Sequence, residues 1–135
     1  MKIWLGNIEE VEKIIRKDLY LDESCELNED FSLRQLNANE DDIPGVLFEV
    51  FNGTGYNFQK YFSAGANKLT SEGKHAFLGL SEHLRKNYPR SRLAVTQSIK
   101  FRNFAENGHL DDVLDFNIAD LAAIKQYAID AKATA

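Results

Sequence analysis

The stretch with the clearest pattern is TSEGKHAFLGLSEHLRKNYP, residues 70–89. Phe77, Leu80 and Leu84 recur with the spacing of one helical face, and the charged residues between them fall on the other side. A threonine or serine at the start supplies a helix cap, and Pro89 stops the helix. The pattern predicts an amphipathic helix from residue 70 or 71 to residue 88, with Leu80 midway along its buried face.

Two further helices are predicted near the ends of the chain. Asn7, with Glu10 three residues later, fits a capping box, and the apolar spacing that follows predicts a helix over roughly residues 8–19. Asn117 is the predicted cap of a last helix, whose small and aliphatic residues face inward.

Five short segments read as strands, at 2–5, 31–34, 46–51, 93–97 and 99–102. Each is short, and each either alternates apolar with polar residues or is rich in β-branched and aromatic ones. No linker or repeat divides the chain. The predicted fold is therefore a single α+β domain over residues 1–135, with a mostly antiparallel sheet of four or five strands packed with about three helices.

Charge is unevenly distributed along the chain, whose formal net charge is −5. Residues 1–45 hold twelve acidic and five basic residues, residues 46–104 three and nine, and residues 105–135 six and two. Charge of one sign gathered on one face steers a partner of opposite sign. Because the total is negative and the basic residues are scattered, nucleic acid is not the expected partner.

Motifs for catalysis or metal binding do not emerge. The Asn-Gly-Thr-Gly turn at 52–55 lacks the Gly-Lys-Ser/Thr ending of a phosphate loop. Cys25 stands among acidic residues, which suppress its thiolate, and the three histidines His75, His83 and His109 have no partner motif. The chain is therefore expected to be no enzyme, with no cofactor and no metal. It also lacks an apolar run of about 18 residues and a signal-peptide core, so we expect a cytoplasmic protein without a membrane partner.

Aromatic residues cluster between 48 and 62, where six of the fifteen in the chain occur. Part of this cluster belongs to the core. Tyrosines also anchor protein interfaces, because they combine an apolar body with a polar tip. Core packing and an exposed patch both remain open for this segment.

The acidic residues of 22–42 fall where little periodic structure is visible, so we expect them on exposed loops. Two such loops beside the strand predicted near 31–36 would form a negative rim, with two tyrosines as anchors beside it. The predicted partner-binding residues are Asp22, Glu23, Glu26, Glu40, Asp41, Asp42, Tyr56 and Tyr61.

Two short stretches carry a resemblance to known families. The opening IWLGN at residues 3–7, followed by an acidic amphipathic helix, resembles the start of small bacterial immunity proteins of polymorphic-toxin and contact-dependent growth inhibition systems. The segment KLTSEG at 68–73, which leads into a helix, is similar to barstar-type nuclease inhibitors. The resemblance implies a protein that binds and neutralises a toxin domain, most simply a nuclease, whose basic cleft the acids and aromatics would fill.

Two other readings stay open. One is a regulatory or scaffolding interaction domain, for example a homodimer formed through the aromatic segment. The other is an enzyme with a site assembled from distant residues, such as His109 with Asp111 or Asp112.

Overall fold

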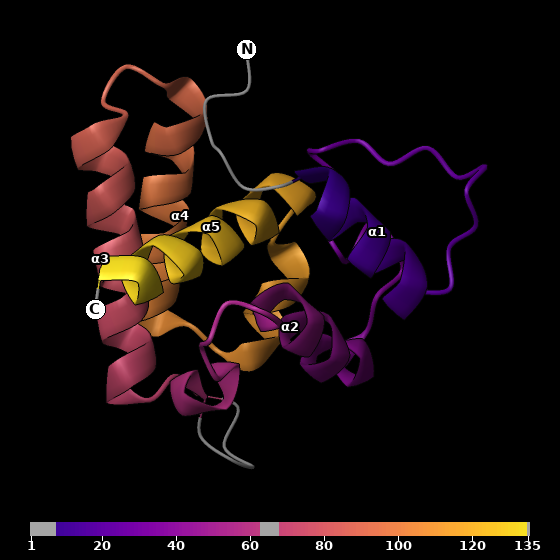
Figure 1. The fold of residues 1–135 in the computed structure, drawn as a ribbon, viewed down its shortest axis with the longest axis horizontal. Helices are drawn as coiled ribbons and strands as arrows, with labels where there is room; N and C mark the ends of the chain where they lie inside the picture. The colour runs from indigo at the N-terminus through magenta and orange to yellow at the C-terminus, as the bar shows by residue number, and fades with distance from the viewer. Residues whose placement is uncertain (1–7, 63–67, 135) are drawn as a thin grey trace. The chain divides into compact units, whose positions relative to one another are not determined.

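A computed structural model describes residues 8–62 and 68–134. Its elements in chain order are α1 (Ile8–Asp18), η1 (Glu40–Asp42), α2 (Ile43–Phe51), η2 (Phe58–Tyr61), α3 (Ser71–Asn87), α4 (Arg92–Asn107), η3 (Leu110–Asp115) and α5 (Ile118–Thr134), where η denotes a 3₁₀ helix. The described residues contain no strand, and their only β pairings are isolated bridges. The fold is all-α (Figure 1).

The predicted α+β class is therefore wrong. Segment 46–51 belongs to α2, and segments 93–97 and 99–102 both belong to α4. Segment 31–34 contributes one bridge, between Ser32 and Asn117, and is otherwise a turn. The strand expected at 2–5 and the IWLGN motif lie outside the described residues.

The misassigned segments are helical because caps and burial outweigh their β propensity. In α2, Pro44 stands at the start, where a missing N–H costs nothing, and residues 43, 46, 47, 50 and 51 form a buried helical stripe. In α4, the Ser91 side chain caps the helix by accepting from the Ala94 N–H at 3.1 Å. The buried face of α4 includes Gln97 and Ser98, so its apolar period is interrupted in the sequence.

The other three helices confirm the predictions. α1 covers residues 8–18, and α3 begins after the cap residue Thr70, whose side chain accepts from the Gly73 N–H. Asn117 and Asp120 form the reciprocal cap of α5, each backbone N–H donating to the other side chain at 2.8 and 3.1 Å. None of the described helices is long and apolar enough to cross a membrane.

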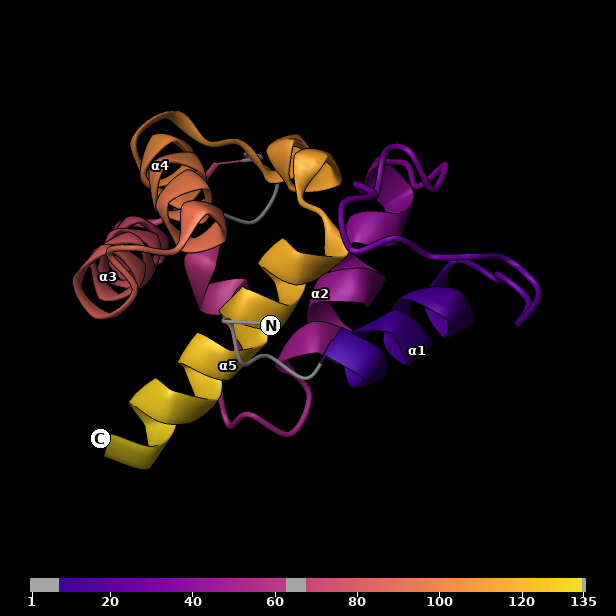
Figure 2. The same cartoon turned by 90° about the horizontal axis from the view of Figure 1, so that it is seen from above.

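The chain divides into two compact units. Unit 2 comprises the described residues 8–57 and 113–134, in which α1, α2 and α5 pack against one another (Figure 2). An ion pair between Lys125 Nζ and Glu10 Oε1, at 2.6 Å, joins α5 to α1.

Unit 1 comprises the described residues 58–62 and 68–112 and is built on the antiparallel hairpin of α3 and α4. Phe77 is the centre of its aromatic cluster. It lies edge-on to Phe104 at a ring distance of 4.8 Å, and it also contacts Tyr61 and Phe101 at 6.2 and 6.1 Å. Such edge-to-face contacts add to the free energy gained from burying the rings.

Replacement of Leu80 by alanine tests the packing of this hairpin. Leu80 is 2% exposed, as its central position in the predicted apolar face requires. Truncation of a buried leucine leaves a cavity, so Leu80→Ala is expected to lower the free energy of unfolding by about 2–5 kcal/mol. Chemical denaturation measures the change, and a loss below about 0.5 kcal/mol would contradict the burial of this residue.

Gly73→Ala tests the approach of η2 to α3. A Cβ at Gly73 would collide with the backbone carbonyl of Tyr61 and would lie 2.9 Å from Leu69 Cδ2. We expect a loss of about 1–3 kcal/mol, because backbone must move to admit the methyl group. Gly45→Ala is the matched control: its Cβ meets only the flexible end of Asp18, at 2.7 Å, so equal effects of the two variants would refute this assignment.

Candidate functional site

The segment between α1 and α2 is anchored by two backbone hydrogen bonds to residues that lie just before α5. The Leu33 N–H donates to the Phe116 carbonyl at 3.0 Å, and the Arg34 N–H donates to the Leu114 carbonyl at 2.8 Å. The Leu33 side chain is buried. These contacts position the following residues, which carry several of the acids predicted to bind a partner.

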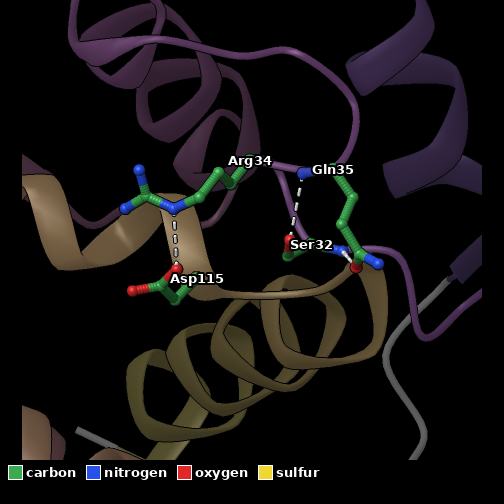
Figure 3. A network of polar contacts seen from close by, with 4 residues as sticks. All are labelled: Ser32, Arg34, Gln35 and Asp115. Carbon is green, nitrogen blue, oxygen red and sulfur yellow. Dashed lines mark hydrogen bonds and ion pairs between the residues drawn. The ribbon is translucent and has the colours of Figure 1, made fainter.

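Side-chain caps make the same segment rigid. The Ser32 N–H donates to Gln35 Oε1 at 2.9 Å, and the Gln35 N–H donates to Ser32 Oγ at 3.1 Å (Figure 3). Asn39 and Asp42 repeat the arrangement: the Asn39 N–H donates to Asp42 Oδ2, and the Asp41 N–H donates to Asn39 Oδ1, both at 2.9 Å. The turns on which the acids stand are therefore preorganised.

Arg34 is held beside these turns by Asp115. Its Nε lies 3.0 Å from Asp115 Oδ1 (Figure 3). Both side chains are largely exposed, so the pair contributes less than about 1 kcal/mol to stability. Its main effect is to fix the direction of the guanidinium group.

A shallow hollow of about 440 Å³ opens at this place in unit 2. Its lining is formed by Arg34, Ala38, Asn39, Glu40, Asp41 and Leu114. The hollow is wide open to solvent and lined mainly by polar surface. Such a surface suits a side chain or loop of a macromolecular partner better than an enclosed small molecule.

Glu40 and Asp41 are the two acids of η1 that remain available to a partner. Both are exposed, and neither carboxylate forms an ion pair or hydrogen bond with the described residues. Asp42 is half-buried and uses its carboxylate as the cap of η1. We call Glu40, Asp41 and the hollow they line the acidic rim.

The other predicted acids, Asp22, Glu23 and Glu26, lie exposed on the loop between α1 and Leu33. Asp22 has a structural task there. Its Oδ1 accepts hydrogen bonds from the Ser24 hydroxyl and from the N–H groups of Ser24 and Cys25. The bond from the Ser24 side chain, and then those from the backbone, lower the pKa of Asp22. Of these three acids, Glu23 and Glu26 keep their carboxylates available for binding.

Asp18, at the end of α1, lies among like charges. Its carboxylate faces Gly45 of α2, and desolvation, followed by the nearby charges of Glu49 and Asp42, raises its pKa above the model-peptide value of 3.8. The junction of α1 and α2 is therefore crowded with negative charge, which a cationic partner would relieve.

The two tyrosines predicted as anchors are placed differently. Tyr61 is 9% exposed and packs on Phe77 in unit 1, so it presents no anchor on the surface. Tyr56 is half-buried in unit 2, and its charge contributes after burial to raising the pKa of Tyr127, which places it near α5. Neither lies in the lining of the acidic rim.

Phe48 is an exposed aromatic residue that sequence reasoning missed. It lies on the solvent side of α2, two helical turns after η1, and its side chain is 59% exposed. The helical spacing of its buried neighbours would have identified Phe48 as outward-facing. From the sequence alone, core packing and an exposed patch both remain open for the aromatic cluster at 48–62, and Phe48 is not among the predicted partner-binding residues.

Over residues 8–62 and 68–134, no group of three acidic, histidine or cysteine side chains is arranged to hold a metal ion. Cys25 is a half-buried free thiol in the loop after α1. The His83 ring is hydrogen-bonded to Asn87: the Asn87 Nδ2 lies 3.1 Å from the His83 Nδ1. His109 and Asp112 form a local turn, in which the His109 N–H donates to Asp112 Oδ2 at 2.9 Å.

The two units differ in the sign of their charge. The described residues of unit 2 include sixteen acidic and six basic residues, a formal charge of −10. Those of unit 1 include five acidic and nine basic residues, a formal charge of +4. Most of the negative charge of unit 2 comes from the acidic block at the start of the sequence, whereas the acids of the C-terminal block are divided equally between the two units.

No protein-family model, curated protein or solved structure matches this chain. Its function is therefore inferred from its own residues.

Asp18→Asn tests the electrostatics beside the acidic rim. Because the pKa of Asp18 is raised on folding, its ionisation disfavours the folded state, and this penalty grows as pH rises above 3.8. Asp18→Asn should therefore be slightly more stable at pH 7, by up to about 0.5 kcal/mol after allowance for solvent screening, and should lose this advantage below pH 3.8.

Asp22→Asn is the control, because the pKa of Asp22 is lowered on folding. Its charge stabilises the fold above its unfolded pKa, and this contribution is lost as pH falls through the folded pKa. Denaturation curves recorded across pH measure the free energy of unfolding of both variants and of the unsubstituted chain. A gain for both variants at pH 7 would contradict the assigned environments.

Proposed function

We propose that this chain is a non-enzymatic immunity protein that acts in the cytoplasm and neutralises a cognate bacterial toxin domain, specifically a nuclease. The observation that carries the proposal is the acidic rim. Glu40 and Asp41 are exposed on a turn that the Asn39–Asp42 cap and the anchored segment at 33–34 hold in place. Preorganised charges lose little entropy on binding.

The rim suits the active cleft of a nuclease. Such a cleft binds phosphate groups and is therefore lined by cations, which free carboxylates can contact in place of the nucleic acid. The charge of −10 on unit 2 extends the attraction beyond the rim and raises the association rate. The resemblance of the chain to immunity proteins points to the same class of partner.

In this proposal Phe48 is the aromatic residue that anchors the partner. An exposed aromatic side chain next to a charged turn can enter a pocket of the partner, and its desolvation slows dissociation. We therefore expect the acids to act mainly on the association rate and Phe48 to act mainly on the dissociation rate.

A regulatory or scaffolding domain is the second candidate. Two exposed aromatic side chains in unit 2, Phe48 and Tyr20, favour an interaction protein in general without selecting a toxin. The gene neighbourhood separates the two candidates, because an immunity gene directly follows the gene of its toxin. A neighbourhood without a secreted toxin would remove the immunity assignment and leave the second candidate.

The decisive experiment measures binding to the C-terminal domain of the toxin encoded directly upstream. Glu40→Lys combined with Asp41→Lys should weaken binding about tenfold or more at low salt, mainly through the association rate, and the difference should shrink at high salt. Asp42 is left intact because it caps η1. Phe48→Ala should raise the dissociation rate.

Glu72→Lys with Glu82→Lys is the matched control. It changes the net charge equally but on α3 of unit 1. If both double variants weaken binding alike, net charge and not the acidic rim determines affinity. Unchanged binding of the rim variant at every salt concentration would exclude the rim from the interface.

A further inference from the structure

The α3–α4 hairpin is fixed in register by two serines. Ser81 Oγ donates to the Ser98 carbonyl at 2.7 Å, and Ser98 Oγ donates to the Ser81 carbonyl at 2.9 Å. Both side chains are buried, so these residues mark the line along which the two helices meet. The aromatic cluster of Phe77, Phe101 and Phe104 lies on one side of that line.

The other side of the hairpin carries exposed aliphatic residues. On α3, Leu78 lies about 60° around the helix from Ser81 and about 160° from the buried Leu80. On α4, Val95 lies about 60° from Ser98, and Ile99 lies about 160° from the buried Phe101. Leu78, Val95 and Ile99 are all exposed, Ile99 by 58%, and together they follow the outer side of the helix contact.

Three arginines and two glutamates surround these aliphatic residues; the glutamates are Glu82, one turn after Leu78 on α3, and Glu106, one turn after Arg102 on α4. Arg92 and Arg102 stand one helical turn before Val95 and about one turn after Ile99 on the same side of α4, and Arg85 lies two turns after Leu78 on α3. All three arginines are exposed. Only Arg102 forms an ion pair with another described residue, a surface contact with Glu106 at 3.4 Å. We call Leu78, Val95, Ile99, Arg85, Arg92 and Arg102 the hairpin face.

The chemistry of the hairpin face selects its occupant. An apolar centre with arginines around it is typical of protein interfaces, and the arginines require an acidic counterpart. A phosphate polymer would make no use of the aliphatic centre. The charge of +4 on unit 1 instead attracts a protein surface as acidic as unit 2, whose charge is −10. The matching surface is therefore an acidic protein surface with an apolar anchor.

The chain itself carries such a surface. The acidic rim exposes Glu40 and Asp41, and Phe48 stands exposed on the helix that follows. We propose that the hairpin face of one copy binds the acidic rim and Phe48 of a second copy. Since two different surfaces meet, the contact is head-to-tail, and each added copy leaves one surface of each kind open.

Sedimentation velocity of the full chain tests this inference. The mass of one chain is 15.3 kDa. At low salt the weight-average mass should rise continuously with protein concentration, and it should return to one chain at about 0.5 M salt, where charges are screened within a few ångströms. A single mass of 15.3 kDa at low salt up to millimolar concentration would overturn the proposal.

Charge exchange makes the test specific. Arg92→Glu with Arg102→Glu, and separately Glu40→Lys with Asp41→Lys, should each abolish self-association, because each variant then presents two surfaces of like charge. An equal mixture of the two variants should associate again, since each surface of one now complements a surface of the other. A mixture that stays monomeric would refute the pairing.

Lys60→Glu with Lys86→Glu is the control, because it changes the charge of unit 1 equally with residues outside the hairpin face. It should preserve self-association, and Ile99→Ser should weaken it.

Sedimentation of a monomeric protein with phosphatidylserine vesicles would instead assign the hairpin face to a membrane and overturn the proposal. The inference does not depend on the proposed function: the Arg92→Glu, Arg102→Glu variant should lose self-association and still bind a toxin domain at least as tightly as the unsubstituted chain.

Discussion

Two backbone hydrogen bonds, from Leu33 and Arg34 to the carbonyls of Phe116 and Leu114, hold together parts of unit 2 that are some 80 residues apart in the chain. They attach an otherwise irregular segment to residues that lie just before α5, and burial of Leu33 excludes water from the contact. This attachment positions the short capped turns that follow in the chain. The acidic rim exists as a defined surface because the backbone beneath it cannot move freely.

Seven of the sixteen acids of unit 2 illustrate two different physical tasks. The carboxylates of Asp22, Asp42 and Asp120 accept hydrogen bonds from backbone N–H groups and so hold turns or helix ends in place. Glu23, Glu26, Glu40 and Asp41 point into solvent. Both groups contribute to the long-range field, but only the second can form direct contacts with a partner. This division is the reason that Glu40 and Asp41 carry the proposed function although Asp42 is next to them.

Unit 1 combines a different set of constraints. Its aromatic cluster occupies one side of the α3–α4 contact that the Ser81–Ser98 pair marks, and the opposite side carries aliphatic residues, arginines and two glutamates. The chain therefore displays two surfaces of opposite charge, each with an apolar element at or beside it. The proposed toxin binding would use the acidic surface, and the proposed self-association would join the acidic surface of one copy to the basic surface of another.

The sequence by itself determined α1 and α3, because each has apolar residues with helical spacing after a residue that can cap a helix. It also determined the start of α5 through the cap residue Asn117, although α5 is apolar on most sides and has no distinct stripe. The exposed loop that it predicted for Asp22, Glu23 and Glu26 is confirmed, whereas Glu40, Asp41 and Asp42 form the 3₁₀ helix η1 and Asp42 is half-buried. The identity of α2 and α4 was decided only by tertiary structure. A short apolar run such as 46–51 suits a buried strand or a buried helix equally, and in α4 the buried Gln97 and Ser98 hide the period. The choice of anchor followed from the same decision, since helical geometry turns Phe48 outward, whereas packing against Phe77 draws Tyr61 into the core.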